Sequence, residues 1–170
     1  MDFLDLIRAR YSVRSYDARP VPQELLLQVL EAGRVAPTAK NMQPQRIYVL
    51  QSEEALAKIR AITPCAFDAP VVLMLCGDTT EGWKKVVTGE DRTETDVAIV
   101  TTHLMLAAAE LGLGTCWVGN FETAKVQKAF DLPAHIFPYE LMPLGYPAKD
   151  AQPSERHTLR KPLADTVRYL

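Results

Sequence analysis

The sequence predicts a protein of the α/β or α+β class, built around a central sheet. Segments with helical periodicity alternate along the chain with short apolar segments typical of strands, which is the pattern of these classes. Residues 71–77 form a continuous apolar run, as expected of a strand buried at the centre of a sheet. Residues 93–113 form a long predicted helix whose apolar side chains cover nearly the whole circumference, so it is expected to be buried on all sides.

The first half of the chain contains two more predicted helices before the first strand. Residues 2–10 place Phe3, Leu6 and Ile7 on one face, which favours a short amphipathic helix. The second helix is expected to begin at Pro22, because proline is favoured in a first turn. That helix is expected to end near 36–37. A strand at 47–51, a helix at 53–61 and the buried strand at 71–77 follow it.

In the second half, the long helix is expected to end at Gly112 and Gly114. A domain of this size has little room to enclose a helix that is apolar all round. One side of it is therefore expected to pack on the chain's own sheet and the other side on a second subunit. From Tyr146 onward, prolines and charges suit an extended tail over about 147–170. The remaining elements are a strand at 115–119, a helix at 122–130 and a strand at 139–144.

Composition limits the possible classes of protein. The chain has 170 residues, 48% hydrophobic and 24% charged, which is typical of one compact domain over 1–170. The formal net charge of −2 gives no general attraction to nucleic acid or to an anionic membrane. We expect no targeting signal and no membrane span, because the apolar runs are too short to cross a bilayer.

The cysteines and histidines indicate neither a disulfide framework nor a metal site. Cys65, Cys76 and Cys116 form no CxxC motif, and the last two lie in apolar segments. Buried free thiols and a cytoplasmic location are therefore expected. The three histidines show no ligand spacing with these cysteines, so no metal is expected.

Residues 10–16, with the sequence RYSVRSY, place two arginines and a serine just past a predicted helix end. A guanidinium group offers a planar fork of donors that matches phosphate oxygens, and Ser12 adds a short neutral donor. Arg10, Ser12 and Arg14 point to one side if the backbone is extended. The segment is either half of a phosphate site or a solvated basic turn.

Residues 36–45 concentrate amide side chains between two prolines, in the connection from a helix to a strand. Asn41 and Gln43 each present a donor and an acceptor, which suits the polar edge of a flavin ring or its ribityl hydroxyls. Pro37 and Pro44 limit backbone freedom and so lower the cost of holding that geometry. The alternative is an ordinary polar loop.

Residues 111–121 combine glycines with a predicted strand end. Gly112 and Gly114 allow the backbone to approach a flat ligand closely, and a strand end with Trp117 and Val118 can line a ring face. No GxGxxG motif opens a helix after a strand here, so this is not a dinucleotide fingerprint.

Taken together and in this order, these segments resemble the nitroreductase family. No single motif is specific, but five of them span nearly the whole chain in the family's order. The resemblance implies a three-layer fold, with a central, mainly antiparallel sheet flanked by helices and the long helix at a homodimer interface. The matching segments are RYSVRSY (10–16), PTAKNMQPQ (37–45), HLMLAAAELGLGTCWVGNF (103–121), MPLGYP (142–147) and RHTLRKPLADTVRYL (156–170).

The resemblance also implies an FMN site at that interface. In the family the basic segment and a C-terminal basic pair hold the phosphate and ribityl chain. A polar loop, usually donated by the partner subunit, contacts the ribityl chain and the ring, and a strand end lies against the ring near N5. These roles fall on Arg10, Tyr11, Ser12, Arg14, Arg160 and Lys161, on Pro37, Thr38, Ala39, Asn41 and Gln43, and on Trp117, Val118, Gly119 and Asn120.

This sequence departs from the family pattern in two places. Thr38 and Ala39 stand where serines are usual, and Gln45 replaces a common aromatic residue. The region 78–94 is shorter than the helical excursions that cover the active site of larger relatives. Its side chains Trp83, Lys84 and Lys85 lie either near the pocket mouth or on an exposed short helix.

The implied activity is that of an oxidoreductase in which the flavin does the chemistry and no side chain acts as a nucleophile. NAD(P)H is the expected hydride donor, and nitroaromatics or quinones are the expected acceptors. Lys40 and Lys161 are candidates to stabilise negative charge at N1 and O2 of the reduced ring. The alternatives are a flavin enzyme of other chemistry, such as reductive dehalogenation or ene reduction, a non-catalytic FMN-binding or storage protein, and a domain without cofactor.

Overall fold

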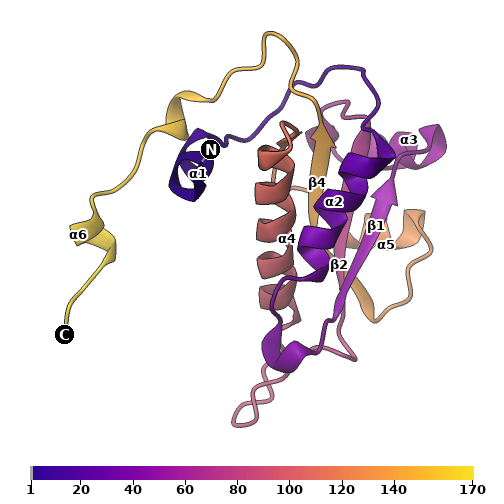
Figure 1. The fold of residues 1–170 in the computed structure, drawn as a ribbon. Helices are drawn as coiled ribbons and strands as arrows, with labels where there is room; N and C mark the ends of the chain where they lie inside the picture. Colours follow the sequence, from indigo (N-terminus) through magenta and orange to yellow (C-terminus); the bar gives the residue numbers. More distant parts are fainter. Residues whose placement is uncertain (1) are drawn as a thin grey trace.

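The computed structural model describes residues 2–170 and contains one four-stranded sheet, of order β1-β2-β4-β3, with every ladder antiparallel. Helices cover both of its faces (Figure 1), so the predicted α+β class and mainly antiparallel sheet are confirmed. The elements are α1 (Phe3–Ala9), α2 (Gln23–Arg34), η1 (Ala39–Asn41), β1 (Gln45–Leu50), α3 (Glu53–Ile62), η2 (Pro64–Ala66), β2 (Val71–Asp78), α4 (Thr93–Glu110), β3 (Gly114–Thr115), α5 (Thr123–Ala129), β4 (Ile136–Gly145), η3 (Glu155–His157) and α6 (Leu163–Thr166).

Strand β2 lies at the centre of three layers, and all of its residues are buried. Leu73 and Leu75 belong to the core under α2 and α4, whereas Val72 and Met74 belong to the core under α3 and α5. Successive side chains of a strand point to opposite faces, so a strand covered on both sides is apolar at every position. This is why the uninterrupted apolar run identified β2 in the sequence.

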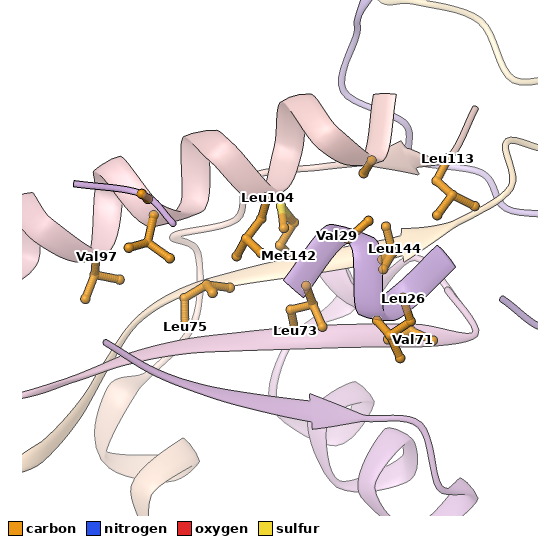
Figure 2. Close-up of a cluster of buried hydrophobic side chains, with 13 residues drawn as sticks. Leu26, Val29, Val71, Leu73, Leu75, Val97, Leu104, Leu113, Met142 and Leu144 are labelled. Carbon is orange, nitrogen blue, oxygen red and sulfur yellow. The ribbon is translucent and has the colours of Figure 1, made fainter. Parts of the chain in front are cut away.

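Helices α2 and α4 pack closely over one face of the sheet. Figure 2 shows Leu26 and Val29 of α2 and Leu104 of α4 directed toward β2 and β4. A Cβ atom at Gly33 would lie 2.7 Å from Leu104 Cδ2, so the glycine is what permits this approach. Complete burial of a leucine or valine side chain contributes about 1.5–3 kcal/mol, which makes this contact a major source of stability.

Helix α4 is buried on its sheet side and only half-covered on the other. Val100 and Leu104 are fully buried, whereas Ile99 and Leu106 remain partly exposed within one chain. The expected packing on the chain's own sheet is confirmed by these contacts. The helix ends before the predicted residue 113 because Gly112 adopts a left-handed conformation (φ 74°), which turns the chain back toward the sheet.

The strand expected after the long helix is shorter than predicted, and the last strand is longer. β3 ends at Thr115, and pairing resumes only at an isolated bridge between Val118 and Leu141. Pro143 of β4 accepts a hydrogen bond from the Cys116 N–H (3.4 Å) but has no N–H to return. The missing donor interrupts the ladder between the two strands.

The segment between β2 and α4 forms a bridged loop, and no helix is present there. Lys84 pairs with Asp91, and the Lys85 N–H donates to the Glu90 carbonyl oxygen (2.9 Å). The loop projects from the body next to the end of α4 at which that helix begins (Figure 1). The alternative of a short exposed helix over Trp83, Lys84 and Lys85 is therefore wrong.

Both chain ends extend away from the body. The C-terminal segment passes beside α1 (Figure 1) and contains only the short elements η3 and α6. This agrees with the predicted extended tail. The predicted N-terminal helix is present as α1, but no residue of it is buried, and Phe3 is 64% exposed. No helix within residues 2–170 combines the length and apolarity needed to cross a membrane.

Candidate functional site

The basic segment RYSVRSY is fixed to the edge of the sheet. Ser12 pairs with Thr115 as a parallel bridge, and the Val13 N–H donates to the Thr115 carbonyl oxygen (2.9 Å). Val13 is 2% exposed, and a Cβ atom at Gly114 would lie 2.5 Å from Val13 Cγ2. Because this valine is anchored in the core, the flanking Ser12 and Arg14 are held at the surface in defined positions.

A cavity of about 230 Å³ lies between this segment and the C-terminal tail. It brings together five residues that the sequence assigned to the phosphate: Arg10, Tyr11, Ser12, Arg14 and Arg160. Lys161, assigned with them, does not line the cavity and is exposed. The cavity lies where α4 ends and β3 begins, since β3 carries the paired residue Thr115.

The tail supplies three further residues to this cavity: Ser154, Arg156 and His157. Their place is fixed by contacts with Tyr11, whose ring meets the His157 ring edge-on at 6.2 Å between centroids and whose hydroxyl donates to the Ala151 carbonyl oxygen (3.4 Å). Sequence reasoning missed them, although Arg156 and His157 stand one helical turn before Arg160 in the same basic stretch.

The cavity has the donor set of an anion site. Four guanidinium groups line it, and none of its lining residues is acidic. Arg10 Nε is buried and has no hydrogen-bond partner within residues 2–170. A buried donor without a partner costs about 1–3 kcal/mol, and a phosphate oxygen would satisfy it with a charge-assisted hydrogen bond. The residues present therefore fit a bound phosphate group.

The polar loop over residues 37–43 lies at the other end of α4. The Ala39 N–H donates to Asp96 Oδ1 (2.8 Å), and the Gln43 N–H donates to the hydroxyl oxygen of Thr38 (3.0 Å). Lys40, Asn41 and Gln43 all have positive φ, between 50° and 56°. Non-glycine residues rarely adopt this conformation, so the loop keeps its shape only because these hydrogen bonds hold it.

Asp96 is a positioning residue that no pattern in the sequence singles out. It is 2% exposed on the first turns of α4, and its Oδ2 atom has no hydrogen-bond partner within the described residues. Burying a carboxylate with only one of its oxygens hydrogen-bonded destabilises the fold. The hydrogen bond to the Ala39 N–H gives this buried carboxylate a structural role, because it holds the loop. The loop leaves Asn41 and Gln43 exposed, and the Gln43 side-chain amide donates to the Asn41 carbonyl oxygen (3.2 Å).

The strand end over residues 117–120 forms the third predicted segment. Val118 is 5% exposed and its side chain belongs to the core. Its side chain therefore cannot line a ring face as predicted, and only its backbone can face a ligand. Gly119 and Asn120 are exposed. The hydroxyl of Thr63 donates to the Asn120 carbonyl oxygen (2.8 Å) and fixes the turn that follows.

Glu140 of β4 lies beside this strand end and was also missed. Its Oε2 atom is 3.6 Å from the position that a Cβ atom would take on Gly119. Burial raises the pKa of the Glu140 carboxyl, a hydrogen bond from Trp117 opposes this rise, and the negative charge of Glu94 adds to it. The strand end therefore carries a half-buried acidic group.

The three predicted segments do not meet within one chain. The loop is bound at Asp96, whereas the arginine cavity lies beyond the other end of α4, near Glu110. These two helix positions are fourteen residues apart, or about 21 Å along the axis. Within residues 2–170, no three His, Cys, Asp or Glu side chains lie together so that they could hold a metal ion.

Comparison with known proteins places the chain in a family. The model of the Nitroreductase family matches residues 7–66 and 60–146, so the chain belongs to that family. It is 39% identical to a nitroreductase family protein of Clostridium difficile 630, whose crystal structure superposes with a TM-score of 0.93 over 99% of this chain and 98% of the other. The chain is also similar to curated proteins that are named for an activity, two of which follow.

One is the NADH dehydrogenase of Thermus thermophilus, 32% identical over 89% of this chain and 90% of the relative. The other is an FMN reductase (NAD(P)H) of Bacillus subtilis, 30% identical over 81% of this chain and 62% of the relative. The resemblance inferred from the five motifs is thereby confirmed.

Replacing Asp96 by alanine is expected to loosen the loop, because the Ala39 N–H loses its acceptor. Amide exchange at Ala39, followed by NMR on the ligand-free protein, should become roughly 5- to 150-fold faster, as expected for a loss of about 1–3 kcal/mol. Asp96→Asn retains an acceptor oxygen and removes the buried charge, so its exchange should stay close to wild type. Equal protection in the wild type and Asp96→Ala would contradict the role of this bond.

Proposed function

We propose that the protein is an FMN-dependent oxidoreductase that uses NAD(P)H to reduce electron-poor acceptors such as nitroaromatics or quinones. The observation that carries the proposal is the arginine cavity, in which Arg10 Nε lacks a partner among the described residues. We infer that the anion is the phosphate of FMN, because a surface for the rest of the cofactor lies next to the cavity. The exposed strand end at Gly119 continues from Thr115 along the same edge of the sheet. The relatives named above support the choice of flavin and nucleotide.

Arg10, Arg14 and Arg160, with the hydroxyl of Ser12, would hold the phosphate. Arginine suits this task because its planar fork matches phosphate oxygens and keeps its charge at every physiological pH. Arg156 joins the same group from the tail. Together these residues would hold the phosphate end of the cofactor and so limit how far its ring can extend along the sheet edge.

A second subunit would complete the site. In a two-fold dimer the same surface of each chain meets its copy, so helices α4 that cross head to tail bring the loop of one chain to the arginine cavity of the other. Thr38, Asn41 and Gln43 would then contact the flavin bound by the partner. Two observations support this arrangement. The outer side of α4 is only half-covered within one chain, and about 21 Å of the α4 axis separates the loop from the cavity.

Bound FMN supplies the acceptor and donor of a hydride at N5 of its ring. The chain's own residues bind and orient. The backbone N–H groups of the exposed Gly119 and Asn120 would face the ring, next to the half-buried Trp117 in the sequence. Lys40 and Lys161, neither of which lines the arginine cavity, are the candidates to offset negative charge at N1 and O2 of the ring.

Residues 1–170 would act as one domain, since the single sheet links both hydrophobic cores. A cytoplasmic location is consistent with three cysteines that form no disulfide, two of them buried.

The absorbance spectrum of the purified protein tests the activity directly. The protein should be yellow or become yellow with FMN, and anaerobic NADH or NADPH should bleach the visible flavin band. A nitroaromatic or a quinone should restore it. Bleaching restored only by a halophenol or an activated alkene would instead assign another flavin chemistry. A yellow protein that neither nucleotide bleaches would be a binding or storage protein, and a colourless one would have no flavin function.

Removing a phosphate contact should weaken FMN binding. A charge-assisted hydrogen bond contributes about 1.5–3 kcal/mol, so Arg14→Ala should raise the Kd of FMN roughly 10- to 150-fold. Arg160→Ala should act in the same direction, and Arg60→Ala, on the far side of the sheet, serves as the control. Unchanged FMN affinity in both test variants would show that the arginine cavity is not the phosphate site.

A further inference from the structure

Glu140 faces the same side of the sheet as the strand end that carries Gly119. Val118 and Leu141 exchange both backbone hydrogen bonds (2.9 Å each), so the next residues along the two strands, Gly119 and Glu140, stand opposite each other. Opposed residues in an antiparallel pair project to the same face. Because Gly119 has no side chain, the space above Glu140 is left open.

A β-bulge fixes this orientation. The register between β2 and β4 shifts between Leu75 and Cys76, which leaves Tyr139 without a direct partner. The Tyr139 ring packs against Gly77, 3.0 Å from where a Cβ atom there would lie. Bulges of this kind re-aim neighbouring side chains and occur next to active sites. Glu140 is thereby held on the face of the sheet that bears α4.

The surroundings of Glu140 are open on one side and acidic on the other. Its Oε2 atom lies 3.6 Å from the Cβ position of Gly119, which is exposed. Glu94, in the first turn of α4, is close enough to add its negative charge. No ion pair with Glu140 occurs among residues 2–170 (the ten ion pairs found there involve other residues).

The proposed flavin site is therefore charged differently at its two ends. The phosphate end has Arg10, Arg14, Arg156 and Arg160, whose charge a phosphate would largely offset. The ring end has the carboxylate of Glu140, and no described residue of the chain pairs with it. A molecule that lies on the ring meets the second end and not the first.

We propose that Glu140 selects acceptors by their charge. The site binds neutral or cationic electron-poor aromatic molecules and disfavours anionic ones. This inference rests on the proposed flavin function and names the substrate class within it. The Glu140 carboxylate and an anionic acceptor on the ring would repel each other. At a separation of a few ångströms near a protein surface, such repulsion weakens binding measurably. The repulsion acts on the acceptor and leaves the phosphate contacts of the cofactor unchanged.

Para-nitrobenzamide and para-nitrobenzoate are the probes, because they are nearly the same size and differ by one negative charge. At about pH 8, above the ordinary range of carboxyl groups, wild-type kcat/KM should favour the amide roughly tenfold, or about 1.4 kcal/mol. Glu140→Gln should bring the two rates within about twofold while the rate with the amide changes little. Glu53→Gln, an exposed carboxylate on the opposite face of the sheet, should keep the wild-type preference.

A binding measurement gives a readout that does not depend on turnover. Benzamide and benzoate should perturb the visible flavin spectrum of the oxidised protein, and the ratio of their Kd values should follow the same pattern in the three proteins. An equal affinity of the wild type for both probes, or an unchanged preference in Glu140→Gln, would overturn the inference. The wild-type comparison keeps it testable even if Glu140→Gln fails to fold.

Failure of this inference can be told apart from failure of the proposed function. If the protein binds FMN and reduces both probes at equal rates, the flavin function stands and the role of Glu140 is wrong. If the protein binds no FMN, or NADH and NADPH leave the flavin oxidised, the proposed function itself is wrong, and the inference falls with it.

Discussion

The packing of helix α4 is the constraint on which the rest of the structure depends. Its inner side is buried against the sheet through Val100 and Leu104, and its outer side stays half-covered in one chain. Its first turns carry Asp96, which binds the strained polar loop, and its far end passes through Gly112 into β3, the strand that fixes the basic segment. The length of this helix keeps the polar loop and the arginine cavity apart within one chain, and in the proposed site a second subunit would bring them together.

This arrangement assigns different tasks to the two ends of the proposed cofactor. At one end, arginines from both chain termini gather around a cavity with an unsatisfied donor, Arg10 Nε. At the other end, the exposed backbone at Gly119 stands opposite the half-buried carboxyl of Glu140, whose pKa burial raises. In the proposed site the basic end would account for affinity, because charge-assisted hydrogen bonds to phosphate are strong. The acidic end would affect which molecules can reach the ring, and therefore the selectivity of the site.

Much of the fold could be predicted from the sequence, because the relevant signals are local. The apolar run of β2 follows from burial on both of its faces, and the apolar side chains of α4 that face the sheet follow from its packing there. The start of β4 at Ile136 could not be predicted, since Pro138 argues against a strand when it is read locally. Within the site, RYSVRSY and its partner Arg160 were accessible as motifs. Asp96 was not, because its role depends on a contact across 57 residues, and Glu140 was not, because it depends on strand register.

The central claim is that each flavin site combines the arginine cavity of one chain with the polar loop of the other, and complementation between variants tests it most directly. Arg14→Ala and the double variant Asn41→Ala/Gln43→Ala should each bind FMN weakly as homodimers. A heterodimer purified through two different tags would carry both defects in one site and none in the other, so one site per dimer should regain wild-type affinity. If loop and cavity of the same chain formed the site, both sites would carry a defect and neither would recover.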